Sequence, residues 1–246
     1  MLDNKKRACY IVPPGTLMGV KMLNQQIREV IQQFRGALPA EMSALIEQGA
    51  GEISALDIVE NALKPGSAVP DFALDNQHGV GKALAGYLGE GPLVLTFYRG
   101  VWCPYCNLQL KAYSDRLSEI EDAGATLVAV SPEKPNALEL LQQSEAPKEV
   151  MEMAFTNVPF DVLFDDGNSL GKAFGLQFEL PESHQQLLKA FNVDLEALTG
   201  NDQFVFPDPA TYVVGADGLI KWAFVPNNYR KRAEVDDILN ALKQLS

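Results

Sequence analysis

The sequence predicts an α/β protein with a mixed β-sheet flanked by helices and with a helical extension at its N-terminus. Residues 93–131 hold two buried-strand patterns with a helical pattern between them, which predicts a βαβ unit with a right-handed crossover. Residues 211–225 hold two further strand patterns around an Asp-Gly turn, which predicts an antiparallel hairpin. Because parallel and antiparallel pairs occur in one chain, we expect a mixed sheet.

The bulk composition limits the class of protein and its partners. The chain has 246 residues, enough for one large domain or for one domain with an extension. Its formal net charge is −12, so nucleic acid and anionic membranes would repel it and neither is an expected partner. No apolar run has the length of a bilayer span, and prolines interrupt the N-terminal segment. Since 3 cysteines are too few for a secreted disulfide scaffold, we expect a reducing, cytoplasmic location.

Residues 1–64 form the predicted extension, and residues 65–246 form the predicted main domain. Residues 1–21 show no regular pattern. Apolar residues then recur at helical spacing, at Leu23, Ile27, Val30, Ile31 and Phe34. A second helical stretch is predicted to end at Gly49, and a third before Pro65. This amphipathic extension could pack on the main domain or pair with a second subunit, so a homodimer is a hypothesis.

The main domain follows the order strand, helix, strand, helix, hairpin, helix. The sequences LVLTFY (93–98) and TLVAVS (126–131) indicate buried strands, and the helix between them ends at Gly124. DVLFDD (161–166) precedes a short helical pattern, and a polar helical insert occupies residues 177–206. The last helix has one apolar face, made of Val235, Ile238, Leu239, Leu242 and Leu245.

Cys103 and Cys106 lie where the first strand of the βαβ unit runs into its helix, in FYRGVWCPYCNLQL (97–110). The N–H groups at a helix start lack partners and carry about half a positive charge, which favours an anion there. Such a position can lower a thiol pKa from about 8.5 to roughly 3.5–7.5, and the thiolate is the nucleophile. Pro104 suits an early helical position. The two-residue gap also lets the sulfur atoms approach and form a reversible disulfide.

Two other interpretations of the cysteine pair stay open, a zinc site and an inert buried pair. Structural zinc needs four ligands, and the other candidates, Cys9, His78 and His184, are scattered along the chain. We expect His78 and His184 to be exposed, because both lie in polar stretches, and Cys9 to be incidental. The glycine-rich stretches 79–83 and 167–173 lack the spacing of a phosphate-binding loop, so no cofactor and no metal are expected.

Several segments, taken in order, resemble the peroxiredoxin-like branch of the alkyl hydroperoxide reductase and thiol-specific antioxidant family, within the thioredoxin-like superfamily. They are PGSAVPDFAL, VLTFYRGVWCPYCNLQL, LVAVSPE, FDVLFDDGNSLGKAFGL, and PATYVVGADGLIKWAFV followed by PNNYRKRAEVDDIL. The resemblance covers residues 65–246 and implies a thioredoxin-like fold around a central mixed sheet. Residues 22–64 also resemble the N-terminal extension of such proteins.

The cysteine loop departs from the usual pattern of that family, Pro-x-x-x-Thr-x-x-Cys. Cys106 takes the position of the peroxidatic cysteine, Cys103 that of the threonine and Arg99 that of the proline. The family's arginine near the start of a late strand is absent from FPDPATYVV. There Pro209 resembles the cis-proline that faces the CxxC of thioredoxins. A cis-proline at this place would leave a facing disulfide open to a partner thiol.

The resemblance implies a thiol-dependent peroxidase. Cys106 would attack a hydroperoxide and become a sulfenic acid, and Cys103 would condense with it to form a disulfide. Arg99 is the nearest candidate to stabilise the departing oxyanion, although a surface salt bridge would explain it equally well. As an alternative, Cys103 would attack a protein disulfide and Cys106 would resolve the product, as in a thiol–disulfide oxidoreductase. A third interpretation is a non-enzymatic redox sensor.

The remaining expectations concern the surroundings of the cysteines and the partners. We expect Trp102 and Tyr105 to position the cysteine loop by packing, and Asn107 to serve the helix start. The expected partners are a hydroperoxide substrate and thioredoxin or another thiol reductant. Neither the reductant nor the kind of hydroperoxide follows from the residues.

Overall fold

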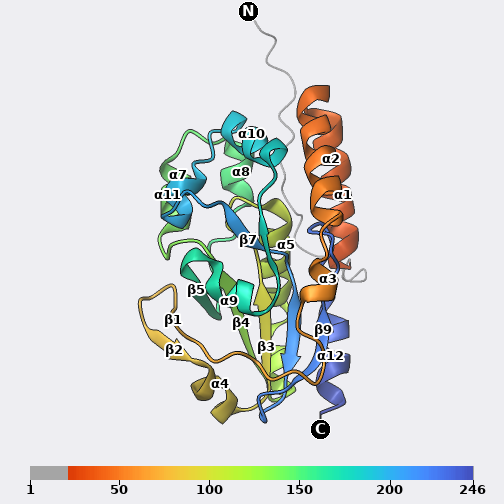
Figure 1. Ribbon diagram of the computed structural model, residues 1–246, viewed down its shortest axis with the longest axis vertical. Helices are drawn as coiled ribbons and strands as arrows, with labels where there is room; N and C mark the ends of the chain where they lie inside the picture. The colour runs from red at the N-terminus through yellow and green to blue at the C-terminus, as the bar shows by residue number, and fades with distance from the viewer. Residues whose placement is uncertain (1–21, 246) are drawn as a thin grey trace, which may run out of the picture.

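The computed structural model describes residues 22–245, so the segment expected to be irregular, 1–21, and Cys9 lie outside the described residues. Its centre is a five-stranded sheet of order β5-β4-β3-β8-β9 (Figure 1). The strands are β3 (Leu93–Phe97), β4 (Thr126–Ser131), β5 (Asp161–Phe164), β8 (Thr211–Val214) and β9 (Ile220–Phe224).

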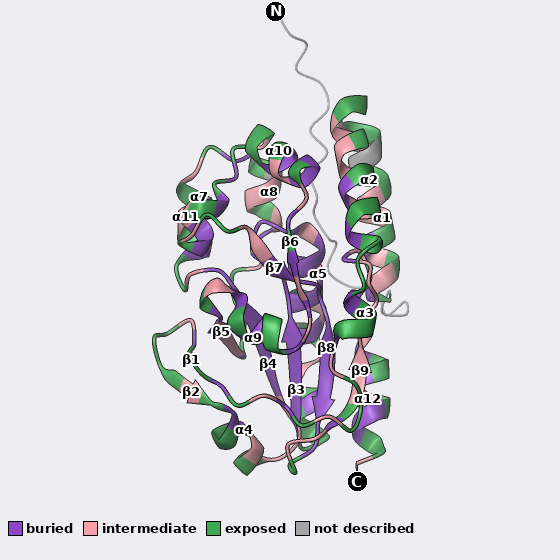
Figure 2. Cartoon of the chain, viewed as in Figure 1, coloured by how far each residue is buried: buried purple, intermediate pink, exposed green. Residues whose placement is uncertain are grey.

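The sheet is mixed, as predicted. β3 and β4 pair in parallel, and so do β4 and β5, whereas β8 runs antiparallel to both β3 and β9. Figure 2 shows the central strands buried, which explains their continuous apolar sequences. Because β3 and β4 are parallel, the loops that follow them lie at the same edge of the sheet. The loop after β3 carries both cysteines, and the loop after β4 carries Glu133.

Helices flank this sheet. They are α4 (Leu84–Glu90), α5 (Pro104–Asp115), α6 (Leu117–Asp122), α7 (Ala137–Gln143), α8 (Lys148–Met153), a 3₁₀ turn (Asp166–Asn168), α9 (Ser169–Ala173), α10 (Glu182–Ala190), α11 (Leu195–Thr199) and α12 (Val235–Lys243). The single helix predicted to end at Gly124 is divided at Arg116, whose φ of −122° and ψ of 20° are not helical. The polar insert contains α10 and α11, and also a two-stranded antiparallel sheet that the pattern did not predict, formed by β6 (Gln177–Glu179) and β7 (Val205–Pro207).

The extension forms three helices, α1 (Leu23–Ala37), α2 (Ala40–Ser54) and α3 (Ile58–Asn61). The prediction that the second helix ends at Gly49 is wrong, since α2 continues to Ser54. An interior glycine costs only about 1 kcal/mol relative to alanine, and here its missing side chain leaves room for α10, which packs against α2 (Figure 1).

The first apolar residues of α1 are buried within the chain. Leu23 and Ile27 are buried in the same hydrophobic core as the sheet. The backbone N–H groups of Leu23 and Asn24 both donate to the carboxylate of Glu234, each at 2.8 Å, which ties the start of α1 to the start of α12. Packing on the main domain therefore explains the apolar pattern at Leu23, Ile27, Val30 and Ile31. The homodimer and the domain boundary at residue 65 stay predictions.

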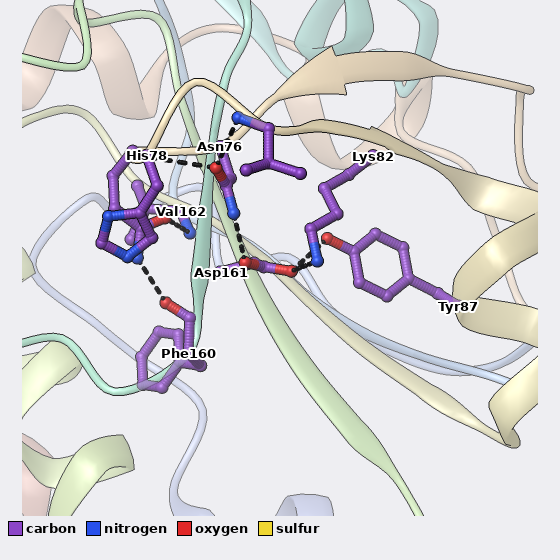
Figure 3. Close-up of polar contacts among 9 residues, drawn as sticks. Asn76, His78, Lys82, Tyr87, Phe160, Asp161 and Val162 are labelled. Carbon is purple, nitrogen blue, oxygen red and sulfur yellow. Dashed lines mark hydrogen bonds and ion pairs between the residues drawn. The ribbon is translucent and has the colours of Figure 1, made fainter.

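At the end of the sheet away from the cysteines, a polar cluster anchors the hairpin of β1 (Ala73–Asp75) and β2 (Gly81–Ala83). Asp161, at the start of β5, accepts hydrogen bonds from Asn76 Nδ2 and the Tyr87 hydroxyl, each at 2.7 Å (Figure 3). Its second oxygen also lies 3.0 Å from Lys82 Nζ. His78 is exposed beside this cluster, as predicted.

Candidate active site

The two cysteines lie at the start of α5. Cys103 is the N-cap residue, Pro104 is the first helical residue, and Cys106 lies in the first turn. The N–H groups of Cys106 and Asn107 both donate to Cys103 O at 3.1 Å, and the Asn107 side chain donates to Val101 O and Cys103 O. Both cysteines are free thiols with no exposed surface. The loop therefore holds a reduced, fully buried dithiol.

Arg99 contacts Cys103 from the loop after β3. Its Nη2 lies 3.1 Å from Cys103 Sγ. The guanidinium also stacks on two aromatic rings, 4.9 Å from the centroid of Trp102 and 4.1 Å from that of Tyr229. Only 3% of Arg99 is exposed, so the surface salt bridge considered for it is wrong. The aromatic rings hold this charge beside the sulfur.

Arg232 contacts the other sulfur, and the sequence did not predict it. Its Nη2 lies 3.2 Å from Cys106 Sγ, and its Nη1 donates to the carbonyls of Tyr229 and Lys231. Arg232 precedes α12 and is 126 residues from Cys106 in the chain, so no local pattern connects the two. The available signal was the run Arg230-Lys231-Arg232, a basic cluster in an acidic chain.

The surroundings shift the pKa values of the two thiols in opposite directions. Burial raises the pKa of Cys106, but a hydrogen bond with Cys103, the charges of Arg232 and Arg99, and the Arg99 backbone N–H outweigh it, so the pKa lies well below its ordinary value. Burial and the hydrogen bond with Cys106 raise the pKa of Cys103 well above its ordinary value, although Arg99 opposes this. The favoured state is a Cys106 thiolate that accepts a hydrogen bond from a Cys103 thiol.

Two buried carboxyl groups lie near the dithiol, and the sequence reasoning singled out neither. Glu133 accepts a 2.7 Å hydrogen bond from Val101 N, and burial raises its pKa well above the ordinary value, with a further contribution from the Cys106 charge. Burial raises the pKa of Asp208 to about 6, although Arg232 and Arg99 oppose the shift. The positive charges of both arginines therefore favour the ionised forms of the cysteines and of Asp208.

The other predicted site residues surround the loop, with one correction. Trp102 packs edge-on against Phe206, with ring centroids 5.5 Å apart. The ring centroids of Tyr105 and Tyr229 are 6.1 Å apart. No peptide bond within residues 22–245 is cis, so the bond before Pro209 is trans and the expected cis-proline is wrong. Pro209 lies two residues before β8.

His184 is buried, contrary to the expectation from its polar surroundings. Only 4% of it is exposed, because it lies on the face of α10 that packs against α2. Its Nε2 lies 3.4 Å from the Tyr229 hydroxyl and 3.3 Å from Ile46 O. Burial, helped by the charge of Arg99, lowers the pKa of His184 to about 4. The imidazole is thus neutral at physiological pH and connects α2, α10 and Tyr229.

A small cavity of about 90 Å³ lies over the cysteine loop. Its lining is mostly apolar and comes from the cysteine loop, the extension, α8, α10 and Tyr229. Within residues 22–245, no group of three or more His, Cys, Asp or Glu side chains is arranged to hold a metal ion. The same part of the chain has no helix that is long and apolar enough to cross a membrane.

A buried dithiol at the start of a helix, after the central strand of a mixed sheet, defines a redox-active protein of the thioredoxin fold. The family model described as "AhpC/TSA family" matches residues 65–223. The chain therefore belongs to the AhpC/TSA family and is a peroxiredoxin-like, thiol-dependent peroxidase.

Individual relatives agree with this assignment. Peroxiredoxin Bcp of Escherichia coli (strain K12) is 29% identical over 184 residues, which cover 75% of this chain and 98% of the relative. The chloroplastic peroxiredoxin Q of Populus jackii is 24% identical over 180 residues, covering 73% of this chain and 68% of the relative.

Solved structures show the same fold. Peroxidoxin BcpB from Mycobacterium tuberculosis superposes with a TM-score of 0.51 and 20% identity, covering 75% of this chain and 99% of that one. The reduced 2-Cys peroxiredoxin of Plasmodium vivax superposes with a TM-score of 0.54 and 17% identity, covering 74% of this chain and 81% of that one. In these comparisons the unmatched part of the chain is about a quarter of its length.

Proposed function

We propose that this chain reduces hydroperoxides with Cys106 as the attacking nucleophile and Cys103 as the resolving thiol. The observation that carries the proposal is the pair of buried arginines, one on each sulfur. Arg232 and the Arg99 backbone N–H favour the Cys106 thiolate, while Cys103 keeps its proton. A thiolate next to a protonated thiol is the arrangement that a two-step dithiol peroxidase needs.

The proposed reaction has three steps. The Cys106 thiolate attacks one peroxide oxygen, so an S–O bond forms, the O–O bond breaks, and the alcohol or water leaves after it takes up a proton. Sulfur is oxidised to the sulfenic acid by two electrons, and the peroxide is reduced. The Cys103 sulfur then attacks Cys106, water leaves with the thiol proton, and a disulfide forms. An external dithiol reduces this disulfide and is itself oxidised.

Both guanidinium groups suit the first step. The departing oxygen develops negative charge as the O–O bond breaks, and charged donors held in a buried site stabilise such charge strongly. Arg99 is held by two aromatic rings and Arg232 by two carbonyls, so neither needs to reorient during the reaction.

Disulfide exchange with a protein substrate is the less favoured alternative. Both sulfur atoms are fully buried, so a protein disulfide cannot reach either without a rearrangement, whereas a peroxide is small. The trans bond before Pro209 also removes one of the two features that favoured this alternative. A sensor function has no feature of its own in its favour beyond the reversible dithiol.

The partners of the peroxidase cycle stay predictions. A thioredoxin-type dithiol is the expected reductant, because proteins of this family are regenerated by thiols. The cytoplasmic location of this chain also stays a prediction, and the plant relatives are named as chloroplastic.

A stopped-flow experiment tests the assignment of the two cysteines. Reduced protein is mixed with hydrogen peroxide or an organic hydroperoxide, and thiol loss is followed. We expect rapid oxidation in the wild type, no oxidation of Cys103 in Cys106→Ser, and a persistent sulfenic acid in Cys103→Ser. A sulfenic acid probe and mass spectrometry identify the oxidised sulfur.

The same reduced protein also distinguishes the peroxidase function from disulfide exchange and from a sensor function. If reduced protein reacts slowly with peroxides but reduces insulin disulfides rapidly, the proposed peroxidase function is wrong. Slow turnover in both assays, together with a protein that binds one redox state only, would favour the sensor instead.

A further inference from the structure

The inference concerns Glu133, a buried carboxyl group beside the cysteine loop, and it rests on the proposed function. Glu133 follows β4, and since β3 and β4 are parallel it lies at the same edge of the sheet as the loop after β3. Only 4% of Glu133 is exposed. Its Oε2 accepts the hydrogen bond from Val101 N, so the carboxyl group holds the backbone between Arg99 and Cys103.

The second oxygen of this carboxyl group has no hydrogen-bond partner. Glu133 Oε1 is fully buried and unpaired among residues 22–245, and so is the indole Nε1 of Trp102. Both atoms lie against Gly100, because an added Cβ there would be 2.3 Å from Glu133 Oε1 and 2.5 Å from Trp102 Nε1. A buried oxygen and a buried N–H group are thus close together without a bond between them.

A proton on Glu133 Oε1 explains both unpaired atoms. A protonated carboxyl group donates through its O–H, and the indole N–H of Trp102 is a donor only, so the two groups do not pair. An ionised carboxylate would accept the indole N–H after a small shift of either side chain. The surroundings favour the proton, since burial disfavours the charged form and Val101 N is the only hydrogen-bond donor to this carboxyl group among the described residues.

The charge on Cys106 acts on the same carboxyl group. The Cys106 thiolate raises the pKa of Glu133 in addition to the effect of burial. Tyr98, which follows β3, interacts with Glu133 as well, but burial raises the pKa of Tyr98, so its hydroxyl carries no charge at neutral pH. The side chain of the neighbouring Lys134 lies against Gly200 instead. The redox state of one sulfur therefore affects whether Glu133 keeps its proton.

Oxidation reverses the charge balance around this group. When Cys106 becomes a sulfenic acid or a disulfide, its negative charge disappears, whereas the positive charges of Arg99 and Arg232 stay beside the sulfurs. A buried site with two cations and no anion favours the ionisation of a nearby acid. Glu133 is such an acid, and Trp102 Nε1 is the donor available to its carboxylate.

We propose that Glu133 is a redox-linked proton site, which releases its proton when Cys106 is oxidised and then accepts a hydrogen bond from Trp102 Nε1. As the Cys106 thiolate attacks the peroxide, the departing oxygen takes the negative charge, and the proton from Glu133 converts it into alcohol or water. Reduction of the disulfide by the external dithiol supplies two protons. One stays on Cys103 and the other returns to Glu133, so Cys106 is a thiolate again.

Proton uptake during oxidation tests this site. When hydrogen peroxide converts a thiolate and a thiol into a disulfide and two water molecules, one proton must be supplied. Reduced protein in weak buffer at neutral pH is mixed with one equivalent of hydrogen peroxide, and a pH-indicator dye reports uptake from the solvent. We expect uptake near zero in the wild type but about one proton per disulfide in Glu133→Gln, which keeps an acceptor for Val101 N and has no proton to release.

Two further variants separate the roles of the neighbouring groups. Trp102→Phe removes the donor to the carboxylate but keeps a ring beside Arg99, so its proton uptake should rise above that of the wild type. Glu139→Gln is the matched control, because Glu139 lies on α7 and is exposed. Its proton uptake should equal that of the wild type.

Infrared difference spectra of the wild type give a test that needs no variant. The C=O stretch of a protonated carboxyl group should disappear on oxidation and return on reduction, and Glu133→Gln should lack this band. Uptake of one proton per disulfide by the wild type, equal uptake by Glu133→Gln and the wild type, or a carboxyl band that persists in the disulfide form would each overturn the proton site. The proposed function fails separately, by slow oxidation of the wild type with peroxide.

Discussion

At the scale of single residues, the reactivity of the dithiol depends on which arginine contacts which sulfur. Arg99 comes from the loop next to the cysteines, and Arg232 from a segment far along the chain. An ordinary buried thiol has a raised pKa, because the interior disfavours its charged form. Cys106 departs from this rule, since two cations and a backbone N–H compensate for the lost solvation.

Replacing Arg232 should impair Cys106 in particular. Arg232→Met removes the nearest cation, so we expect the pKa of the Cys106 thiol to rise and its oxidation rate at neutral pH to fall, by roughly 10²–10³-fold if the guanidinium also stabilises the leaving oxygen. The ultraviolet absorbance of the thiolate, followed during a pH titration, reports the pKa.

Arg230→Met is the control for this substitution. Arg230 is nearby in the chain, but it pairs with Glu47 and not with a sulfur. Its substitution should leave the thiol titration unchanged. An equal shift in both variants would show that net charge, rather than the contact of Arg232 with Cys106, sets the pKa.

His184 should make the folded protein sensitive to mild acid. Its pKa is about 4 when folded, below its ordinary value, so between those values the unfolded chain binds the additional proton. The free energy of unfolding should therefore fall, by up to about 3 kcal/mol, as the pH decreases from about 6.5 to about 4. Asp208 has the opposite sign, because its raised pKa makes the folded state bind the proton.

Denaturant unfolding of the wild type and of His184→Asn over this pH range measures the effect. The variant should lose the His184 contribution and become more stable in acid relative to neutral pH than the wild type does. If the two pH profiles have the same slope, His184 is charged in the folded state and its assigned environment is incorrect.

At the scale of elements, the position of α2 against α10 depends on one glycine. An added Cβ at Gly49 would lie 2.4 Å from His184 Cδ2, closer than atoms pack. Gly51 belongs to the same helix, and an added Cβ there would meet no described heavy atom within 4 Å. Substitutions at the two glycines therefore distinguish the effect of helix propensity on stability from the effect of helix packing.

Gly49→Ala should destabilise the protein by about 1–3 kcal/mol, because the His184 ring must move out of its place between α2 and Tyr229. Gly51→Ala should instead stabilise it by about 0.5–1 kcal/mol, since alanine favours the helix. Chemical denaturation of both variants provides the comparison. Equal stabilisation by both would mean that α2 and α10 are not in close contact at Gly49.

At the scale of the whole molecule, the charge state of one sulfur should affect global stability. The pKa of Cys106 is lowered by folding, so between its folded value and its ordinary value of about 8.5 the unfolded chain binds more protons. The reduced protein should become more stable as the pH rises through this interval, by at most about 1.4 kcal/mol per pH unit.

The variant Cys106→Ser should not gain this stability as the pH rises. Unfolding of the reduced wild type and of the variant, measured between about pH 6 and pH 8, gives the difference. Cys103 contributes in the opposite sense, because its raised pKa favours the folded state until the pH exceeds its ordinary value. A wild-type profile as flat as that of the variant would show that Cys106 is a thiol in the folded protein.

Local patterns in the sequence determined the mixed sheet, the helical extension and the place of the dithiol. Strand and helix periods depend on neighbouring residues only, and so do the helix start at Pro104 and the hairpin turn. Glycine at position 49 misled the prediction of α2, because the sequence shows the cost of a glycine but not the partner that requires it.

Only the tertiary structure decided the electrostatics of the site. Arg232, Glu133, Asp208 and His184 reach the cysteines or Arg99 from other elements, and no spacing along the chain encodes such contacts. The same holds for the trans bond at Pro209 and for the cavity between α2 and α10. A pKa depends on burial and on charges within a few ångströms, and the chain acquires both only when distant segments pack together.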